Sequence, residues 1–420
     1  MFGVNTGSDE LMQAFLQNLR QSKRRLGLRL NNFVANYKWR VSREISHQRR
    51  LFHYRATVFR ANKCFHNRDG RRFLELHGLL TEFLKKQIKN NPDRARLIAG
   101  QLDNVLRNCD QITYEEPGTA EAYALLHFLD RYHRFQLIFD SLHKQKLLPW
   151  RGVEINILDV GTGPGPSMYA VSDYYSTILK KDVTCDVNGG RLPFSIDYVE
   201  KSQEFRNWLH HFTEFVNYDC PTKNPWQVPF HHGSFSDFAN LEFNQPKIKW
   251  DQDDDGDQVA KIYIKKHRFD IIVFSNFLTT KEQVAGFSKE IENCARFLRN
   301  NGILLIVGAR GFTNKYREVY DSISETIVSG GYSNRKMVAS CKKVDIRDSI
   351  MSYSWRDCYG ERLKQLIRVV YDVFEPDAKD SIPDKTFDLL RRTMQAEYSK
   401  AIEWEILVFQ KKARPRYNKK

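Results

Sequence analysis

The sequence predicts an α/β protein, in which a mostly parallel sheet with helices on both faces follows an all-helical N-terminal unit. Three observations predict this fold class. An apolar run at residues 155–160 ends in a glycine-rich turn, and helix-compatible sequence follows it. Further apolar runs at residues 269–274 and 303–307 are separated by a helical segment. Apolar residues recur at helical spacing through most of residues 1–149.

The glycine-rich turn lies in Ile155–Pro166, which reads INILDVGTGPGP. Glycines at three alternate positions let the backbone turn sharply and come close to a ligand. The free N–H groups at the start of the following helix favour a carboxylate or phosphate. A dinucleotide site needs Gly or Ala three residues after its second glycine, and Pro166 occupies that position here. The turn is therefore not expected to bind NAD or FAD.

The pattern Asp159-Val160-Gly161-Thr162-Gly163-Pro164-Gly165 resembles motif I of class I S-adenosylmethionine (SAM) dependent methyltransferases. The resemblance implies a Rossmann-like, seven-stranded methyltransferase sheet with SAM as cofactor. It places the methionine half of SAM on the turn, against Gly161, Thr162, Gly163 and Gly165. It also implies that Asp159 orients the turn or reaches the amino group of the cofactor.

Later segments supply the expected ribose and adenine positions. A second strand at residues 194–199 ends at Glu200, whose carboxylate can accept hydrogen bonds from both ribose hydroxyls. An ordinary surface glutamate is the alternative interpretation. A third short strand is expected at residues 228–232. The segment after it resembles the family's adenine segment through Ser234 and Phe235, with Ser234 where aspartate is usual.

The methyl acceptor is expected at the end of the fourth strand, residues 269–274, which runs into Ser275-Asn276-Phe277-Leu278. Ligands of open α/β sheets bind at the carboxyl ends of the strands. The resemblance makes this segment motif IV, although Phe277 and Leu278 replace the prolines of the amino-group methyltransferases. Asn276 is the candidate catalytic residue that holds the acceptor, and Ser275 is assigned to the cofactor. Arg131 or Tyr132, on the helix before the turn, is a further candidate for covering the cofactor.

The predicted domains are a basic helical domain at residues 1–149 and a methyltransferase domain at residues 150–420. The resemblance implies an antiparallel pair of strands after the fifth strand, with a helical insertion at about residues 345–400. The expected elements are helices at 8–25, 29–65, 71–89, 92–109, 119–146, 167–180, 201–216, 281–299, 314–329, 360–374 and 385–400, closing strands at 336–342 and 402–409, and a hairpin within 240–266.

Other chemistries lack their signatures. No cysteine occupies motif IV, no Cys/His cluster has metal-ligand spacing, and no Gly-x-Ser-x-Gly elbow is present. The acidic run that begins at Asp251 matches the start of an EF-hand loop. Its twelfth position is Ile262, where calcium binding requires a bidentate glutamate. No metal site is therefore predicted.

Positive charge is concentrated at the two ends of the chain. The formal net charge is +15, and residues 1–75 contain 16 Lys and Arg against 5 Asp and Glu, a net of +11. Residues 411–420 add six basic residues and no acidic one. This distribution predicts an RNA or other polyanionic partner. A solvated basic face is the alternative.

The composition also limits where the protein is expected and what it does. Seven cysteines without a CxxC pair, no long apolar run and no signal-peptide core predict a cytoplasmic protein without a membrane partner. Three functions stay open. They are methylation of RNA or a ribonucleoprotein, methylation of a protein or small molecule, and non-catalytic binding or assembly through the same fold.

Overall fold

The computed structural model describes residues 69–108, 114–149, 155–179, 194–219, 234–235, 244–252, 258–266, 268–309, 315–329, 341–354 without 346 and 348, 360–372 and 401–411. The chain divides into two compact units, Met1–Arg60 and Ala61–Lys420, and all described residues belong to the second unit. This division differs from the boundary predicted at residue 149. The helices expected at residues 8–25 and 29–65 lie outside the described residues.

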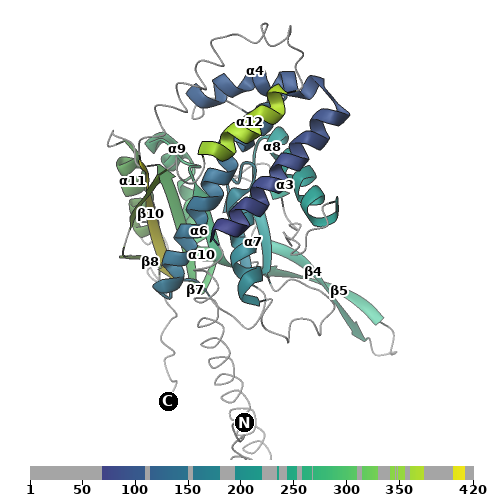
Figure 1. Cartoon of the computed structure of the whole chain (residues 1–420). Helices are drawn as coiled ribbons and strands as arrows, with labels where there is room; N and C mark the ends of the chain where they lie inside the picture. Colours follow the sequence, from purple (N-terminus) through teal and green to yellow (C-terminus); the bar gives the residue numbers. More distant parts are fainter. Residues whose placement is uncertain are drawn as a thin grey trace, which may run out of the picture. The chain divides into compact units, whose positions relative to one another are not determined.

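An eight-stranded sheet forms the centre of the second unit (Figure 1). Its strands are β1 (Ile155–Val160), β2 (Phe194–Val199), β3 (Ser234–Phe235), β6 (Phe269–Ser275), β7 (Leu298–Ala309), β8 (Cys341–Val344), β9 (Ile350–Ser354) and β10 (Ala401–Lys411). The order is β3-β2-β1-β6-β7-β10-β8, and β9 pairs with β10 off this path. The pairs among β1, β2, β3, β6 and β7 are parallel, whereas β10 runs antiparallel to β7, β8 and β9.

This strand order confirms the predicted fold class. Renumbered in chain order without β9, the strands lie as 3-2-1-4-5-7-6. A dinucleotide-binding sheet has the order 3-2-1-4-5-6. Here the antiparallel last strand is inserted between the fifth and sixth, as expected from the predicted closing pair. The sheet is therefore Rossmann-like, with the antiparallel closing pair that the resemblance implies and with β9 as an addition that the sequence did not predict.

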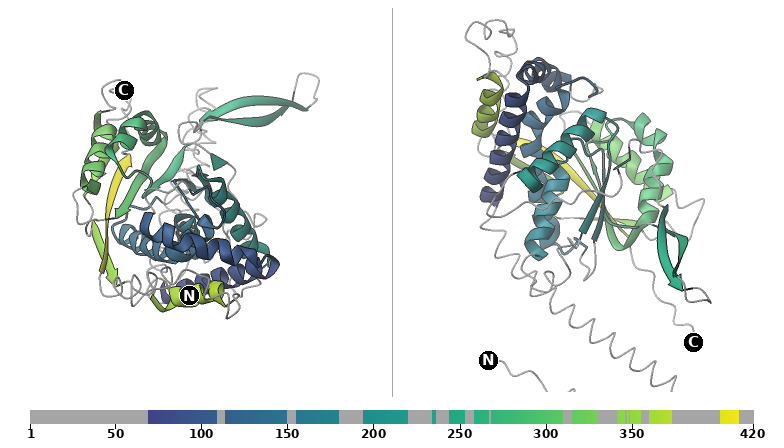
Figure 2. Two further views of the ribbon diagram at one scale, coloured as in Figure 1. Left: turned by 90° about the horizontal axis from the view of Figure 1, so that it is seen from above. Right: turned by 90° about the vertical axis from the view of Figure 1, so that its right-hand side faces the viewer.

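Helices cover both faces of the sheet (Figure 2). One face of the sheet shares an apolar core with α3 (Asp69–Asn90), α4 (Asp93–Asn108), α5 (Thr119–Tyr123), the π-helix η1 (Ala124–Phe128), α6 (Leu129–Lys144), α7 (Pro166–Leu179), α8 (Gln203–Glu214), η3 (Phe215–Asp219) and α12 (Glu361–Tyr371). The other face packs against α9 (Lys281–Gly286), α10 (Ser288–Phe297) and α11 (Lys315–Ser329).

The central strands separate these two cores because successive side chains of a strand point to opposite faces. Ile157 of β1 lies in the first core and its neighbour Leu158 in the second. Ile271 and Ile272 of β6 divide in the same way. Strands buried on both faces read as continuous apolar runs, which explains why they were recognisable in the sequence.

The N-terminal helices belong to the same core as the sheet. Arg72 of α3 donates a hydrogen bond to Asp173 of α7 at 2.7 Å, and Tyr132 of α6 donates to the same carboxylate at 3.2 Å. Leu76 and Phe128 lie in one apolar cluster with Ile157. These contacts make α3 to α6 part of the sheet-containing unit.

Most predicted element bounds agree with the structure, with two clear errors. The strand β9 lies inside the insertion that was predicted to be helical at about residues 345–400. The helix predicted at residues 281–299 is two helices, α9 and α10, and it ends at Phe297 because β7 begins at Leu298. Asn301, expected at the helix exit, lies inside β7 with a positive φ of 64°.

The predicted hairpin is present as β4 (Asn244–Gln252) and β5 (Gln258–Lys266), which pair antiparallel. Its acidic tip at residues 253–257 lies outside the described residues, as do the strand expected at 228–232 and the helix expected at 385–400. From the predicted insertion, α12 packs against α3 and α4. Among the described helices, none combines the length and hydropathy that a membrane span requires.

Candidate cofactor-binding site

The glycine turn joins β1 to α7 in a conformation that requires glycine. Gly161, Gly163 and Gly165 have φ values of 69°, 55° and 87°, in the left-handed region that other residues rarely adopt. The N–H groups of Gly161 and Thr162 donate to the carbonyl oxygen of Val199 at 2.8 and 3.2 Å. The turn is thereby fixed to the end of β2.

Asp159 holds the inside of this turn. Its Oδ2 accepts hydrogen bonds from Thr162 Oγ1, at 2.5 Å, and from Ser167 Oγ. Burial raises the pKa of Asp159 to about 6, and the two hydroxyl hydrogen bonds oppose that rise. Its Oδ1 is buried with no hydrogen-bond partner among the described residues. Of the two roles expected for Asp159, these contacts fit the one that orients the turn.

A cavity of about 240 Å³ lies at the carboxyl ends of β1, β2 and β6. It is lined by Tyr114, Tyr123, Arg131, Gly161, Thr162, Gly163, Pro166, Ser167, Val199, Glu200, Lys201, Phe205, Ser275, Asn276, Phe277 and Phe287. A Cβ added to Gly163 would meet no atom within 4 Å, so the backbone of this glycine faces open space. The cavity is where an open α/β sheet binds its ligand.

Glu200 joins the end of β2 to the glycine turn. Its Oε2 accepts from the Gly163 N–H at 2.7 Å, and its Oε1 accepts from the Ser202 N–H at 2.9 Å. Burial raises the pKa of Glu200, and the two backbone hydrogen bonds oppose that rise. A carboxylate has about four acceptor positions, so two more hydrogen bonds can still be accepted.

The end of β6 forms the opposite wall through Ser275, Asn276 and Phe277. Asn276 has a positive φ of 48°, and its N–H donates to the carbonyl oxygen of Val307 at 2.9 Å. The ring of Phe277 lies against Gly161, because an added Cβ there would be 2.6 Å from Phe277 Cδ2. This close approach is a second reason for glycine at position 161.

The helical segment before the turn supplies a third wall. The guanidinium of Arg131 lies 4.9 Å from the ring centre of Tyr123, and both line the cavity. Tyr132, the other covering candidate, is fully buried and donates to Asp173 instead. Tyr114 and Phe205 also line the cavity, and their ring centres are 4.9 Å apart. Neither residue belongs to a recognisable motif, so the sequence alone did not reveal them.

Six of the ten predicted site residues line this one cavity: Gly161, Thr162, Gly163, Glu200, Ser275 and Asn276. Asp159 lies beneath it, and Gly165 faces Leu209 of α8. Ser234 and Phe235 form β3, paired with Tyr198 and Val199 at the end of β2, and their side chains lie outside the described part of the chain. Among the residues that the structure describes, no cluster of three or more His, Cys, Asp or Glu is placed to hold a metal.

Solved structures match the chain at low sequence identity and with TM-scores below 0.5. No protein-family model matches it, and neither does any curated protein. Matching solved structures include coclaurine N-methyltransferase bound to N-methylheliamine and SAH, with 10% identity, 81% of this chain and 95% of that chain covered, and a TM-score of 0.37. The N-methyltransferase NodS from Bradyrhizobium japonicum matches with 11% identity, 68% and 96% coverage, and a TM-score of 0.31. The [4+2]-cyclase SpnF matches with 13% identity, 66% and 81% coverage, and a TM-score of 0.33.

Proposed function

We propose that the chain binds SAM in the cavity above the glycine turn and transfers its methyl group to an acceptor in RNA or a ribonucleoprotein. The observation that carries the proposal is the convergence of the turn, Glu200 and the Ser275-Asn276 segment on one cavity. These segments come from three different strands, and each was assigned to the cofactor or acceptor from its motif alone.

The lining residues fit the parts of SAM. Glu200 has acceptor positions left for the ribose hydroxyls, and the open space over Gly163 leaves room for the methionine half. Arg131 offers a guanidinium that suits the methionine carboxylate. When bound, SAM supplies an activated methyl group on a cationic sulfur, so the leaving group needs no acid.

The chain must therefore align the acceptor and shield the reaction from water. Asn276 lies just after the end of β6 and lines the cavity. Its side-chain amide can orient the methyl acceptor by donating a hydrogen bond from its NH₂ group or by accepting one at its oxygen. The rings of Tyr114, Tyr123, Phe205 and Phe277 supply the apolar part of the wall.

The net charge of +11 in residues 1–75 supports RNA as the macromolecule that carries the acceptor. A small-molecule acceptor is the second candidate. It is favoured by the aromatic enclosure, in which Tyr114 and Tyr123 lie 5.2 Å apart between ring centres. Both candidates use the same cofactor site.

The test of the cofactor site is calorimetric titration of SAM into the intact protein and two glycine variants. Gly163→Arg places a long side chain in the cavity and is expected to abolish binding. Gly100→Arg is the matched control, because Gly100 is exposed on α4 and an added Cβ there meets nothing within 4 Å. Wild-type affinity in a folded Gly163→Arg variant, or no SAM binding by the wild type, would overturn the proposal.

Transfer of a labelled methyl group from SAM then distinguishes the acceptors. RNA, protein and small-molecule fractions are each incubated with the wild type and with Gly163→Arg. We expect label in the RNA fraction with the wild type only. Label confined to another fraction would instead favour the second candidate or a protein acceptor.

A further inference from the structure

A second cavity, which we call the α3–α8 groove, is lined by other residues of α5 and α8, two helices that also contribute to the cofactor cavity. It has a volume of about 500 Å³ and is lined by residues of α3, α4, α5, α8 and η3. It shares no lining residue with the cavity above the glycine turn. Its size is within the range of pockets that bind small organic molecules.

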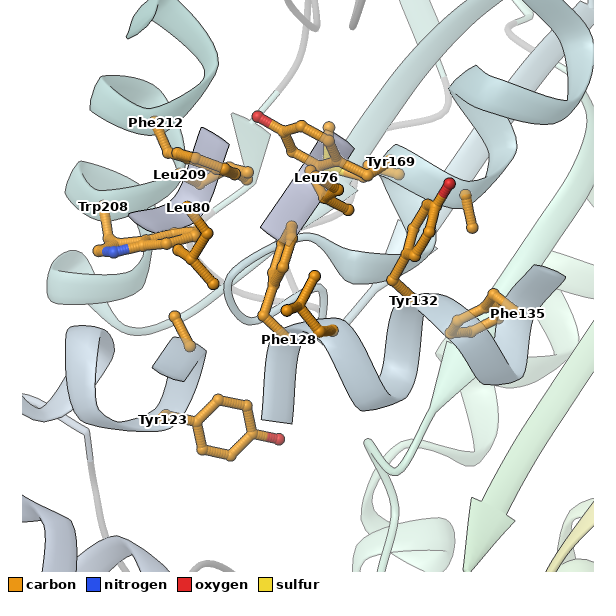
Figure 3. Packing of buried hydrophobic residues seen from close by; sticks show 14 of the residues in the cluster. Leu76, Leu80, Tyr123, Phe128, Tyr132, Phe135, Tyr169, Trp208, Leu209 and Phe212 are labelled. Carbon is orange, nitrogen blue, oxygen red and sulfur yellow. The ribbon is translucent and has the colours of Figure 1, made fainter. Parts of the chain in front are cut away.

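Aromatic side chains form the apolar part of the groove. Phe83, Trp208 and Phe215 line it and are all buried, and the ring centre of Phe83 lies 6.0 Å from that of Trp208 and 5.4 Å from that of Phe215. Figure 3 shows Trp208 projecting from α8 beside Leu80 of α3. The ammonium of Lys86 lies 5.6 Å from the ring centre of Phe215. An aromatic wall of this kind also attracts the cationic group of a ligand.

Carboxylates dominate one end of the groove. Glu121 is 1% exposed, and its Oε1 accepts from Arg94 Nε at 2.7 Å. Glu204 Oε2 lies 4.0 Å from Arg94 Nη2, so two carboxylates share one guanidinium. Partial burial and the nearby Glu121 raise the pKa of Glu204, whereas Arg94 lowers it. This end therefore carries more negative than positive charge.

Two buried polar atoms of the groove residues lack partners. Glu121 Oε2 accepts no hydrogen bond and Trp208 Nε1 donates none among the described residues. Buried polar atoms are nearly always paired in proteins, and an unpaired one is costly.

From these observations, we propose that the α3–α8 groove binds a small organic cation with a planar amidinium or guanidinium group. That group pairs with Glu204, whose carboxylate is partly exposed and lies 4.0 Å from Arg94, because a planar fork of donors matches a carboxylate. The apolar body of the ligand packs against Trp208 and Phe215. The site is separate from the cofactor cavity, and the proposal does not depend on methyl transfer.

Benzamidine is the probe for this site, since it combines an aromatic ring with an amidinium group. Calorimetric titration into the intact protein is expected to give saturable binding. Benzamide has the same shape without the charge and is expected not to bind. Glu204→Gln should weaken benzamidine binding roughly 10- to 100-fold, which is the usual effect of losing a charge-assisted hydrogen bond.

Two variants control for effects elsewhere. Glu82→Gln changes an exposed carboxylate of α3 that pairs with Lys85 outside the groove, and it should keep wild-type affinity. Gly163→Arg should also bind benzamidine normally, which separates this site from the cofactor cavity. The proposal is overturned if benzamidine does not bind, if benzamide binds equally well, or if Glu204→Gln retains full affinity.

Discussion

Asp159 holds the glycine turn through hydrogen bonds and also makes the stability of the fold depend on pH. It is fully enclosed, two hydroxyl groups donate to one of its oxygens, and its other oxygen is unpaired among the described residues. Burial favours the neutral form of a carboxyl group, so the native state holds this proton more tightly than the unfolded chain does.

The consequence is a pH dependence of the free energy of unfolding. The native pKa of about 6 lies above the ordinary value of 3.8. The protonated Asp159 therefore stabilises the folded state to its full extent only at a pH below 3.8. This stabilisation is lost as the pH rises through 6. We expect the unfolding free energy of the wild type, relative to Asp159→Asn, to fall by about 2–2.5 kcal/mol between pH 4 and pH 7.

Urea unfolding of the two proteins across this pH range measures the difference. The asparagine of the variant keeps an oxygen for Thr162 and Ser167 but does not titrate, so other titrating groups cancel in the comparison. A difference that does not change with pH would show that Asp159 ionises normally.

At the scale of elements, α8 connects the glycine turn to the helical layer. Trp208, Leu209 and Phe212 project from α8 toward the cluster formed with Phe128 and Leu80 (Figure 3). Phe212 is fully buried, and its ring centre lies 4.8 Å from that of Trp208 and 5.5 Å from that of Phe128. Leu209 packs against Gly165 of the turn. The position of the turn thus depends on the packing of this helix.

Truncation of this helix face should be strongly destabilising. Phe212→Ala leaves a cavity among buried rings and is expected to lower the unfolding free energy by about 3–5 kcal/mol. His210→Ala on the exposed face of the same helix is the control, with an expected change within about 0.5 kcal/mol. Chemical denaturation measures both. A change below about 1 kcal/mol for Phe212→Ala would mean that the cluster repacks freely.

The whole molecule is strongly basic, and most of its excess positive charge lies in residues 1–75. If these residues contact RNA phosphates, binding releases counterions. The logarithm of the affinity should then fall linearly with the logarithm of salt concentration, by about 0.7 for each single-strand phosphate contact.

Replacing Lys23, Arg24, Arg25, Arg49 and Arg50 with glutamine should flatten that slope and leave SAM affinity unchanged. Filter binding of RNA across a salt series, with wild type and variant side by side, measures the slopes. Equal slopes would show that these five residues do not contact RNA phosphates and belong to a solvated face. A small molecule or a protein would then be the favoured methyl acceptor.

The sequence by itself determined which segments form the central strands and in what order they follow one another along the chain. Residues 155–160, 269–274 and 303–307 are buried on both faces of the sheet, and this burial leaves mainly apolar runs in the sequence, interrupted only at Asn156, Asp159 and Asp270. The glycine turn and Glu200 were also recognisable. The turn needs positive φ values at Gly161, Gly163 and Gly165, so its glycines form a pattern that is visible in the sequence. Glu200 directly follows a predicted strand, so its position at the end of that strand could also be recognised.

The tertiary structure alone decided which distant surfaces meet. Periodicity reports that a helix has an apolar face but not which surface covers that face. The sequence therefore did not reveal that α3–α6 share a core with the sheet, or that Tyr114 and Phe205 close the cofactor cavity. The α3–α8 groove was equally hidden, because Glu121 and Glu204 are 83 residues apart and acquire a shared environment only when α5 packs beside α8.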